Sequence, residues 1–332
     1  MNINLIPSNN GLGHVKRMVL LSNYLVKNHS VKLIAQPNKI NKFKIKNKVK
    51  IHKFKIDLEI SKKKYNYHWC ENLNKKLLVE KKEEITITDN LPEIIKYKKN
   101  SILFANFFWH QILKINLRKK KIINKEIKLN RFPVICNYLF VHKKIINNFK
   151  IKRVGFFGKF RGKKKKIIKN ILISIGTAKI ETKTLKNINK EVDEIIDKFD
   201  NQKIIFFIDP LIFKKLNLKF RKNVLIANYS TDMYKKIDLA IIKPGLGTIT
   251  SCLEYSIPMI CYMKNFNKEF EHNSNIILKK KLGFKVSNLK KIFNIIKYKI
   301  DNNTYLNNYY LKCKKIKWNG ESEVESIIKK FF

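Results

Sequence analysis

The sequence predicts an α/β protein built from two doubly wound parallel-sheet domains that face each other across a cleft. Short apolar runs alternate with helical patterns of roughly 10–15 residues, which is typical of βαβ units. The alternation restarts in the second half of the chain, and each half contains a glycine-bearing turn between a strand and a helix. Four of the ten glycines lie in these two turns. The length of 332 residues also favours two domains.

The first half predicts an N-terminal domain over residues 1–157. Strands are expected at residues 2–6, 31–35, 49–56, 85–88, 101–105 and 153–157, and helices at residues 15–27, 65–82 and 92–98. Each strand is a short apolar run that a parallel sheet would bury on both faces. Residues 116–131 are charged and weakly patterned, so no element is assigned to them.

A basic stretch separates the two halves. Residues 158–168 contain Lys163–Lys166 and two glycines, and they are interpreted as an interdomain linker. Strands then follow at 170–175, 203–208, 224–227, 239–242 and 259–262, and helices at 184–199, 231–236, 246–255, 268–281 and 289–300. This order predicts a C-terminal domain over 169–315, followed by a tail at 316–332 with an amphipathic helix.

The charge is strongly positive, with 72 Lys and Arg against 25 Asp and Glu and a net charge of +47. Such a balance raises the possibility of a polyanion partner. Only six of the basic residues are Arg, however, and Arg is the residue that reads bases and phosphates with two hydrogen bonds. The charge is therefore interpreted as spread over solvated faces, with no specific nucleic-acid partner. An attraction to anionic membrane surfaces remains expected.

Cysteine usage and hydropathy bear on the cellular compartment. Five cysteines without a CxxC pair argue against a disulfide framework and a zinc site. No signal-peptide pattern opens the chain, and the most apolar stretch, residues 102–113, is too short to span a bilayer. We expect a cytoplasmic protein, with a peripheral position on the inner face of the membrane as an additional possibility.

The first glycine turn places a histidine where parallel sheets hold their ligands. Gly11-Leu12-Gly13-His14 follows the first strand, and His14 opens the helix. A helix N-terminus disfavours imidazolium, so His14 is a candidate base. Asp89 ends the strand at 85–88 on the same sheet edge and is a candidate to orient His14. The alternative is that each residue only caps the helix beside it. Arg17, in the first helical turn, could meet a phosphate or remain solvated.

The second glycine turn, Pro244-Gly245-Leu246-Gly247-Thr248, follows the strand at 239–242. Its exposed N–H groups and the helix dipole suit a phosphate. One βα unit later, residues 267–275 contain acids, amides and His272 at the start of a helix. These groups suit a polyol ligand, although capping alone can also explain the acids.

These motifs together resemble those of the GT-B glycosyltransferases, especially the MurG-like group of lipid-intermediate and UDP-glycosyltransferases (family 28-like). The resemblance is carried by residues 8–17, 89–92, 105–109 and 174–178 and most strongly by 238–275, where Pro-Gly-x-Gly-Thr precedes Glu-x-Glu-His-Asn. It implies two Rossmann-like domains, an acceptor held by the N-terminal one, and a nucleotide-sugar donor, of the UDP-linked kind, held by the C-terminal one. It implies no cofactor and no bound metal, because helix dipoles and backbone amides stabilise the departing diphosphate.

Site residues follow from the resemblance. His14 would be the base, with Asp89 beside it, and the acceptor-side loop would comprise Asn10, Gly11, Leu12, Gly13 and Arg17. The donor site would comprise Ser174, Gly176, Thr177, Gly245, Leu246, Gly247, Thr248, Ser251, Glu254, Glu269, Glu271, His272 and Asn273. One departure concerns Ser251, which stands where relatives often have an acidic ribose ligand. Either Glu254 substitutes for that ligand or nucleotide binding is altered.

The resulting functional hypothesis is an inverting, metal-independent glycosyltransferase of the hexosyltransferase type. It would move a sugar to a hydroxyl of a saccharide, lipid-linked or small-molecule acceptor in the synthesis of cell-envelope or surface polysaccharide. Two alternatives stay open. One is a sugar-nucleotide epimerase or nucleotide-sugar hydrolase on the same fold, and the other is a polyanion-binding protein without catalysis.

Overall fold

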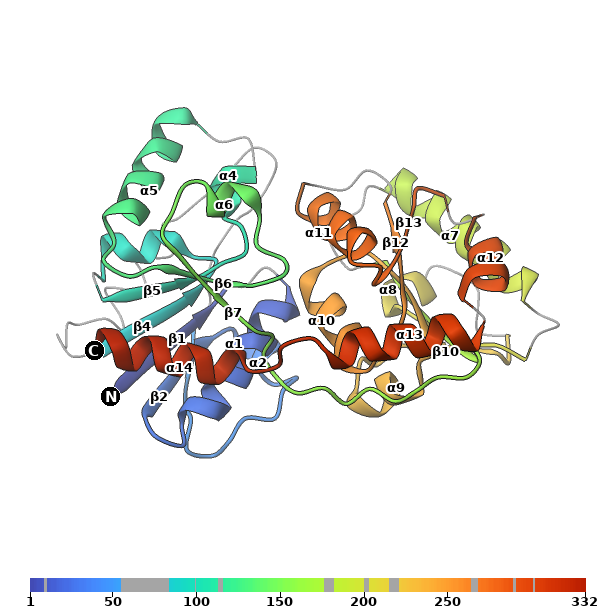
Figure 1. The fold of residues 1–332 in the computed structure, drawn as a ribbon, viewed down its shortest axis with the longest axis horizontal. Helices are drawn as coiled ribbons and strands as arrows, with labels where there is room; N and C mark the ends of the chain where they lie inside the picture. Colours follow the sequence, from blue (N-terminus) through green and yellow to red (C-terminus); the bar gives the residue numbers. More distant parts are fainter. Residues whose placement is uncertain are drawn as a thin grey trace. The chain divides into compact units, whose positions relative to one another are not determined.

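The computed structural model describes residues 1–8, 11–54, 84–98, 100–112, 116–175, 182–199, 203–214, 221–263, 268–288, 291–300 and 302–332. Within these residues the chain forms two compact units, one of Met1–Lys159 with Lys317–Phe332 and one of Phe160–Ile316 (Figure 1). The helix expected at 65–82 lies outside the described residues. Each unit is built around one parallel sheet, as the alternation of strands and helices predicts.

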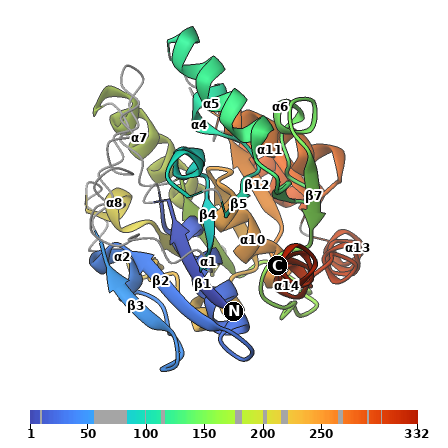
Figure 2. The ribbon, with the colours of Figure 1, turned by 90° about the vertical axis from the view of Figure 1, so that its left-hand side faces the viewer.

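The sheet of the first unit has seven parallel strands in the order β3-β2-β1-β4-β5-β6-β7 (Figure 2). The strands are β1 (Asn2–Pro7), β2 (Ser30–Ala35), β3 (Lys50–Lys53), β4 (Glu84–Asp89), β5 (Ser101–Phe104), β6 (Val134–Asn137) and β7 (Ile151–Val154). The helices are α1 (Leu12–Leu25), α2 (Pro37–Ile40), η1 (Pro92–Lys96), α4 (Trp109–Ile112), α5 (Leu117–Leu129), α6 (Lys143–Ile146) and α14 (Gly320–Phe331). The strand order reverses between β1 and β4, which makes their carboxyl ends the switch point of the sheet.

Alternate side chains of these strands enter two apolar layers. Leu5, Ile87 and Phe104 point to the layer that α1 and α14 cover. Ile6 and Leu103 point to the opposite layer, which η1, α5 and α6 cover. Because successive side chains of a strand alternate between faces, a sheet covered on both sides buries both sets, and in β4 both the Ile and the Thr side chains are buried.

The second unit has six parallel strands in the order β10-β9-β8-β11-β12-β13. The strands are β8 (Asn170–Ser174), β9 (Ile205–Ile208), β10 (Val224–Ile226), β11 (Leu239–Ile242), β12 (Met259–Tyr262) and β13 (Gly283–Val286). The helices are α7 (Thr182–Lys198), α8 (Pro210–Phe213), α9 (Thr231–Lys236), α10 (Leu246–Glu254), α11 (Lys268–Lys279), α12 (Ile292–Ile295), the π-helix η4 (Ile296–Ile300) and α13 (Asn303–Lys314). Its switch point lies between β8 and β11.

Helix α5 forms where the sequence analysis assigned no element. The Asn116 side chain caps it by accepting a hydrogen bond of 2.8 Å from the Arg118 N–H. Among its apolar residues, Ile123 and Ile127, four positions apart, are buried, and most of the remaining surface is charged or polar. Strands β6 and β13, the short helices α2, α4, α6 and α8, and helix α13 were missed as well.

The basic stretch 158–168 was expected to be a linker without packing, and this expectation was wrong for its second part. Arg161 Nε pairs with Glu254 Oε1 at 3.0 Å, and the backbone N–H of Arg161 donates to the Glu254 carbonyl at 2.8 Å. Lys165 Nζ lies 3.2 Å from Asp238 Oδ1, and Ser256 donates to the Lys163 carbonyl. Residues from Phe160 onward therefore belong to the second unit.

The tail after Ile316 returns to the first unit rather than standing apart. Glu321 and Glu323, in the first turn of α14, accept the backbone N–H groups of Gly158 and Gly155 at 2.6 and 2.7 Å. Further along the helix, Glu325 Oε1 lies 3.0 Å from His29 Nε2. These contacts and the buried apolar face of α14 make the tail part of the first unit's core.

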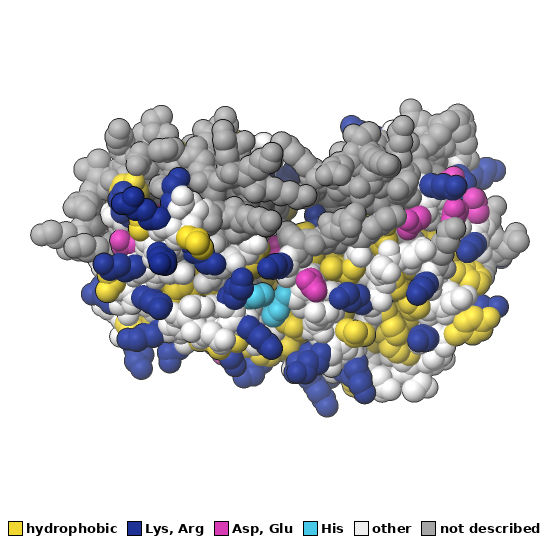
Figure 3. Space-filling view, turned by 90° about the horizontal axis from the view of Figure 1, so that it is seen from above, with side chains coloured by type: hydrophobic (Ala, Val, Ile, Leu, Met, Phe, Trp, Pro, Cys, Tyr) yellow, Lys and Arg dark blue, Asp and Glu magenta, His cyan; other side chains and the backbone are white. Residues whose placement is uncertain are grey.

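Lys and Arg side chains are scattered over the face shown in Figure 3 rather than gathered into one patch. Cys136, Cys252, Cys261 and Cys313 are free and buried, whereas Cys70 lies outside the described residues. Over the described ranges, no helix has both the length and the apolar character needed to cross a bilayer.

Candidate active site

The candidate site of the first unit lies at the N-terminal end of α1. Gly11 is the N-cap residue, and its φ of 98° lies in the left-handed region that favours glycine. A Cβ added at Gly11 would meet nothing within 4 Å, so the backbone angle rather than the available space requires glycine there. No side chain caps the helix, and its first turn contains no acid. Leu12 is 39% exposed and Gly13 is half-buried.

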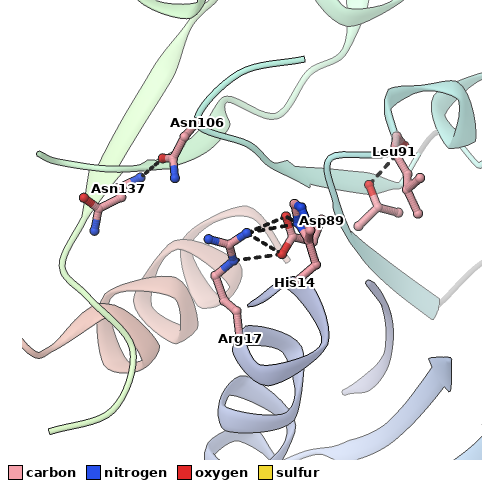
Figure 4. A network of polar contacts seen from close by, with 7 residues as sticks. His14, Arg17, Asp89, Leu91, Asn106 and Asn137 are labelled. Carbon is pink, nitrogen blue, oxygen red and sulfur yellow. Dashed lines mark hydrogen bonds and ion pairs between the residues drawn. The ribbon is translucent and has the colours of Figure 1, made fainter. Parts of the chain in front are cut away.

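The structure brings His14 and Asp89 into contact at the switch point of the first sheet. Pro7 and Asp89 are register partners at the carboxyl ends of β1 and β4, so the turn into α1 passes beside Asp89. His14 Nδ1 lies 2.9 Å from Asp89 Oδ1 (Figure 4). The Asp89 side chain is fully buried, whereas that of His14 is 15% exposed. A histidine in contact with both a buried carboxylate and solvent has the arrangement of an oriented base.

Arg17, one helical turn after His14, holds the same carboxylate. Its Nε donates to Asp89 Oδ2 at 2.8 Å and its Nη2 donates to Asp89 Oδ1 at 2.9 Å. The guanidinium also lies over the Phe104 ring, 4.7 Å from the centroid. The sequence analysis left Arg17 as a phosphate contact or a solvated side chain, but the structure commits it to Asp89.

This arrangement keeps Asp89 ionised. Burial alone would raise the pKa of Asp89, but the charge of Arg17 and the hydrogen bonds from His14 and Arg17 hold it below its ordinary value. An ionised carboxylate only accepts hydrogen bonds, so we assign the imidazole proton to Nδ1. The Nε2 atom of neutral His14 then carries the lone pair that a general base requires.

The alternative that these two residues only cap helices does not fit the structure. The N-cap of α1 is Gly11, and the N-cap of η1 is Leu91; neither makes a side-chain capping bond. Asp89 instead faces α1 across the sheet edge. The contact between His14 and Asp89 therefore needs an explanation other than local helix stability.

The aromatic segment after β5 is buried. Phe107, Phe108 and Trp109 are at most 8% exposed, so they form a packed cluster rather than an open acceptor-binding wall. Asn90, which has a φ of 61°, ties this cluster to β4. In the amide orientation that suits its neighbours, Asn90 donates to the Phe107 carbonyl at 2.9 Å and accepts from Trp109 Nε1 at 3.2 Å.

The second unit has a candidate site of its own at the turn after β11. Gly245 is the N-cap of α10, and neither a capping side chain nor a first-turn acid occupies this helix end. Residues 245–248 are half-buried. Asn273, from α11, donates its Nδ2 to the Pro244 carbonyl at 2.9 Å and is buried, so it positions the turn rather than presenting itself to a sugar.

Lys243, immediately before this turn, was missed by the sequence analysis. It is 9% exposed, and its Nζ lies 4.5 Å from the centroid of the Phe270 ring. Burial lowers the pKa of Lys243, and the nearby Glu269 carboxylate partly opposes that shift. The sequence feature that could have identified Lys243 is its position as a single cation at the end of an apolar strand, directly before Pro-Gly. A cation beside an uncapped helix N-terminus strengthens an anion site.

Three of the predicted donor residues are engaged within the second unit. Ser174 Oγ, at the end of β8, lies 3.1 Å from Tyr229 Oη, which donates to Asp209. Ser251 donates back to the Gly247 carbonyl at 3.3 Å and is buried. Glu254 is the last residue of α10 and pairs with Arg161, and its role as a substitute ribose ligand stays a prediction.

The remaining predicted donor residues can be located as follows. Glu269, Glu271 and His272 lie near the start of α11, where Glu271 is exposed and the other two are half-buried. Asn10, Gly176 and Thr177 lie outside the described residues.

The solved structures compared with the chain here are glycosyltransferases. The chain is similar over 99% of its length to the glycosyltransferase VinC in complex with dTDP (TM-score 0.64, 9% identity, 99% of that chain). It is also similar to the calicheamicin glycosyltransferase CalG4 (TM-score 0.62, 11% identity, 98% of that chain). A third is the spinosyn forosaminyltransferase SpnP (TM-score 0.62, 7% identity, 99% of that chain). No protein-family model and no curated protein matches the sequence.

The chain has the GT-B fold. Both parallel sheets, with their surrounding helices, match GT-B glycosyltransferase structures over nearly the whole chain. At 7–11% identity the likeness establishes the architecture and not the reaction. The narrower resemblance to the MurG-like group stays a prediction.

Proposed function

We propose that this GT-B chain is a glycosyltransferase that moves a sugar from a nucleotide-sugar to an acceptor hydroxyl. The observation that carries the proposal is the contact of His14 Nδ1 with the buried, ionised Asp89 at the switch point of the first sheet. Ligands of such sheets bind outside the carboxyl ends of the strands, which is where Nε2 is available. Arg17 fixes the carboxylate from its other side.

In the proposed reaction, His14 Nε2 takes the proton of the acceptor hydroxyl. The acceptor oxygen forms a bond to the anomeric carbon while the bond from that carbon to the diphosphate oxygen breaks and its electron pair leaves with the diphosphate. A single displacement of this kind inverts the anomeric configuration. Asp89 stabilises the imidazolium that forms, in the way an orienting carboxylate does in catalytic triads.

The second unit would hold the leaving diphosphate. The uncapped N-terminus of α10 offers backbone N–H groups and a favourable dipole, and Lys243 adds a positive charge beside it. Among the described residues, no three His, Cys, Asp or Glu side chains gather as metal ligands would. Metal independence, the UDP-linked donor and a role in cell-envelope or surface polysaccharide synthesis remain part of the proposal.

An anionic membrane surface is proposed as a further partner, through helix α5. Leu117, Ile122 and Leu129 are 73%, 53% and 71% exposed on this helix, which also carries Arg118 and several exposed lysines. Exposed apolar side chains among cations suit the interface of an anionic bilayer. Co-sedimentation with phosphatidylglycerol vesicles should fall when Leu129 is replaced by Glu, and equal binding of both proteins would contradict this surface.

The central test uses nucleotide-sugars directly. Thermal unfolding with a panel of UDP- and dTDP-sugars should identify a donor, because a ligand that binds only the folded state raises its stability. With that donor, His14→Ala should abolish transfer while the donor-induced rise in unfolding temperature is kept. Unchanged transfer would remove the base assignment. Product formed from the donor alone would instead favour an epimerase or a hydrolase.

A further inference from the structure

Three polar side chains end neighbouring strands on the face of the first sheet that α1 covers. Ile87 of β4, Phe104 of β5 and Ile135 of β6 all enter the apolar layer under α1. The side chain two residues later in an extended strand points to the same face, and these positions are Asp89, Asn106 and Asn137. Figure 4 shows Asn106 and Asn137 in the same neighbourhood as His14, Arg17 and Asp89.

Asn106 lies in the bend just after β5, where one more ladder bond to β6 is made. The Ala105 N–H donates to the Ile135 carbonyl at 2.9 Å, which continues the ladder between β5 and β6. Ala105 belongs to the opposite apolar layer, and Asn106 follows it in the bend after β5, with its amide oxygen on the Asn137 N–H of β6. Phe104, two residues before Asn106, is the ring over which the Arg17 guanidinium lies. Two residues of strand advance by roughly 7 Å, which takes Asn106 to the carboxyl edge beside the base.

Only one end of the Asn106 amide is used within the described protein. Its Oδ1 accepts the Asn137 N–H at 2.7 Å. Its Nδ2 is buried and has no hydrogen-bond partner within the described ranges, although the residue is only 6% exposed. Figure 4 shows the amide oxygen joined to Asn137 and the amide nitrogen beside it without a dashed line. A buried donor without a partner is costly, and such groups point to a function.

We propose that Asn106 binds the acceptor: its Nδ2 donates a hydrogen bond to an acceptor oxygen next to the hydroxyl that His14 deprotonates. The inference rests on the proposed glycosyltransferase function and specifies its acceptor class. An acceptor with oxygens on adjacent carbons, such as a saccharide, meets both His14 and Asn106. A lone phenol hydroxyl meets only His14. A site built to bond an oxygen discriminates strongly against an analogue that lacks it, because the buried donor is then left unpaired.

The variant that isolates this donor is Asn106→Asp. It keeps an oxygen for the Asn137 N–H and replaces the donating nitrogen by a second oxygen, and the negative charge that it adds is also added by the control variant below. The matched control is Asn137→Asp, the same substitution at the neighbouring strand end, where the side-chain oxygen accepts the N–H groups of Leu139 and Phe140. The probes are methyl β-glucoside with its monodeoxy analogues, and 4-methylumbelliferone as a phenol without a neighbouring oxygen.

We expect the two variants to lose kcat/KM to different extents on the two acceptors. Asn106→Asp should lose about 10- to 100-fold with the glucoside and less than about threefold with the phenol. One deoxy analogue should be poorer than the glucoside for the unsubstituted protein and no poorer for Asn106→Asp. The Asn137→Asp control should stay within about threefold on both acceptors. Equal losses for the two variants, or equal effects on both acceptors, would overturn the proposal.

A second readout does not depend on turnover. In a ¹⁵N-labelled sample, the Asn106 side-chain amide signal is the one lost in Asn106→Asp, and it should shift on titration with methyl β-glucoside and not with 4-methylumbelliferone. No shift with the glucoside overturns the acceptor role. The two proposals can fail separately. If no nucleotide-sugar raises the unfolding temperature but the Asn106 amide signal still shifts with the glucoside, the proposed sugar transfer is wrong and the saccharide site is supported.

Discussion

Replacement of Asp89 by Asn should slow sugar transfer about 100- to 1,000-fold without weakening donor binding. His14 Nδ1 and Asp89 Oδ1 are 2.9 Å apart, so the two charge centres are roughly 4 Å apart once the imidazolium forms. At an effective dielectric constant of about 20, such a pair interacts by about 4 kcal/mol. If about half of the charge has developed in the transition state, the loss is about 2 kcal/mol, or about 30-fold in kcat.

The tautomer adds to this loss. A side-chain amide at position 89 can donate to His14 Nδ1, which moves the imidazole proton to Nε2 and occupies the atom that must accept the acceptor proton. The assay is transfer from the donor found by thermal stabilisation, with donor affinity measured in parallel. Removal of the Asp89 carboxylate also leaves the buried part of Arg17 without its partner, which could destabilise the fold. Circular dichroism is therefore used to check that the variant is folded. Asp232→Asn, at an exposed ion pair on α9, is the matched control and should leave kcat unchanged. A kcat for Asp89→Asn above about one third of the unsubstituted value would refute the reasoning.

Three further predictions concern the charges and the turns. Lys243→Met should weaken binding of the nucleoside diphosphate at least about 10-fold in calorimetry, whereas Lys235→Met should not. Gly11→Ala should lower the midpoint of thermal unfolding by a few degrees, because a left-handed φ costs a residue with a Cβ about 1–2 kcal/mol; an unchanged midpoint would contradict this. The folded pKa of Asp89 is lowered, so its contribution to stability is complete above its unfolded pKa of about 3.9 and disappears as the pH falls through the folded value. The difference in unfolding temperature between Asp89→Asn and the unsubstituted protein should therefore shrink below about pH 4, and a constant difference would contradict the assignment.

The central strands could be predicted because the sequence carries their burial directly. β8 and β11 are nearly continuous apolar runs, and β1 and β4 place buried Ile and Leu residues among Asn and Thr, so the buried strands can be identified from composition. The missed elements obey other rules. α5 needs only Ile123 and Ile127 inside, and β13 begins at Gly283, whose added Cβ would clash with the Met259 carbonyl at 2.2 Å. Such elements are decided by neighbours that are distant in sequence.

The candidate site was predictable where topology alone fixes the contact. His14 and Asp89 follow strands that become neighbours at a switch point, and the carboxyl ends of parallel strands meet at one edge. The roles of Arg17 and Glu254 depend instead on side-chain direction. Arg17 was open to a phosphate or to solvent until the structure showed both oxygens of Asp89 within its reach. Glu254 is a candidate ligand in the sequence, and only the structure shows that Arg161 pairs with it.

The two glycine turns look alike in sequence, yet the buried charges beside them give them opposite electrostatic characters. Each turn follows the first or fourth strand of a doubly wound sheet and opens a helix without a capping side chain. Beside the first turn lies the buried carboxylate of Asp89, which offsets the positive end of the helix and favours a protonated imidazole in the transition state. Beside the second lies the buried ammonium of Lys243, which adds to the helix dipole and favours an anion. An anion at the first turn would be repelled by the Asp89 carboxylate. A base at the second turn would have a lowered pKa, because the positive charge of Lys243 disfavours its protonated form. The same backbone turn therefore suits proton abstraction in one unit and diphosphate binding in the other, because one buried charge differs in sign.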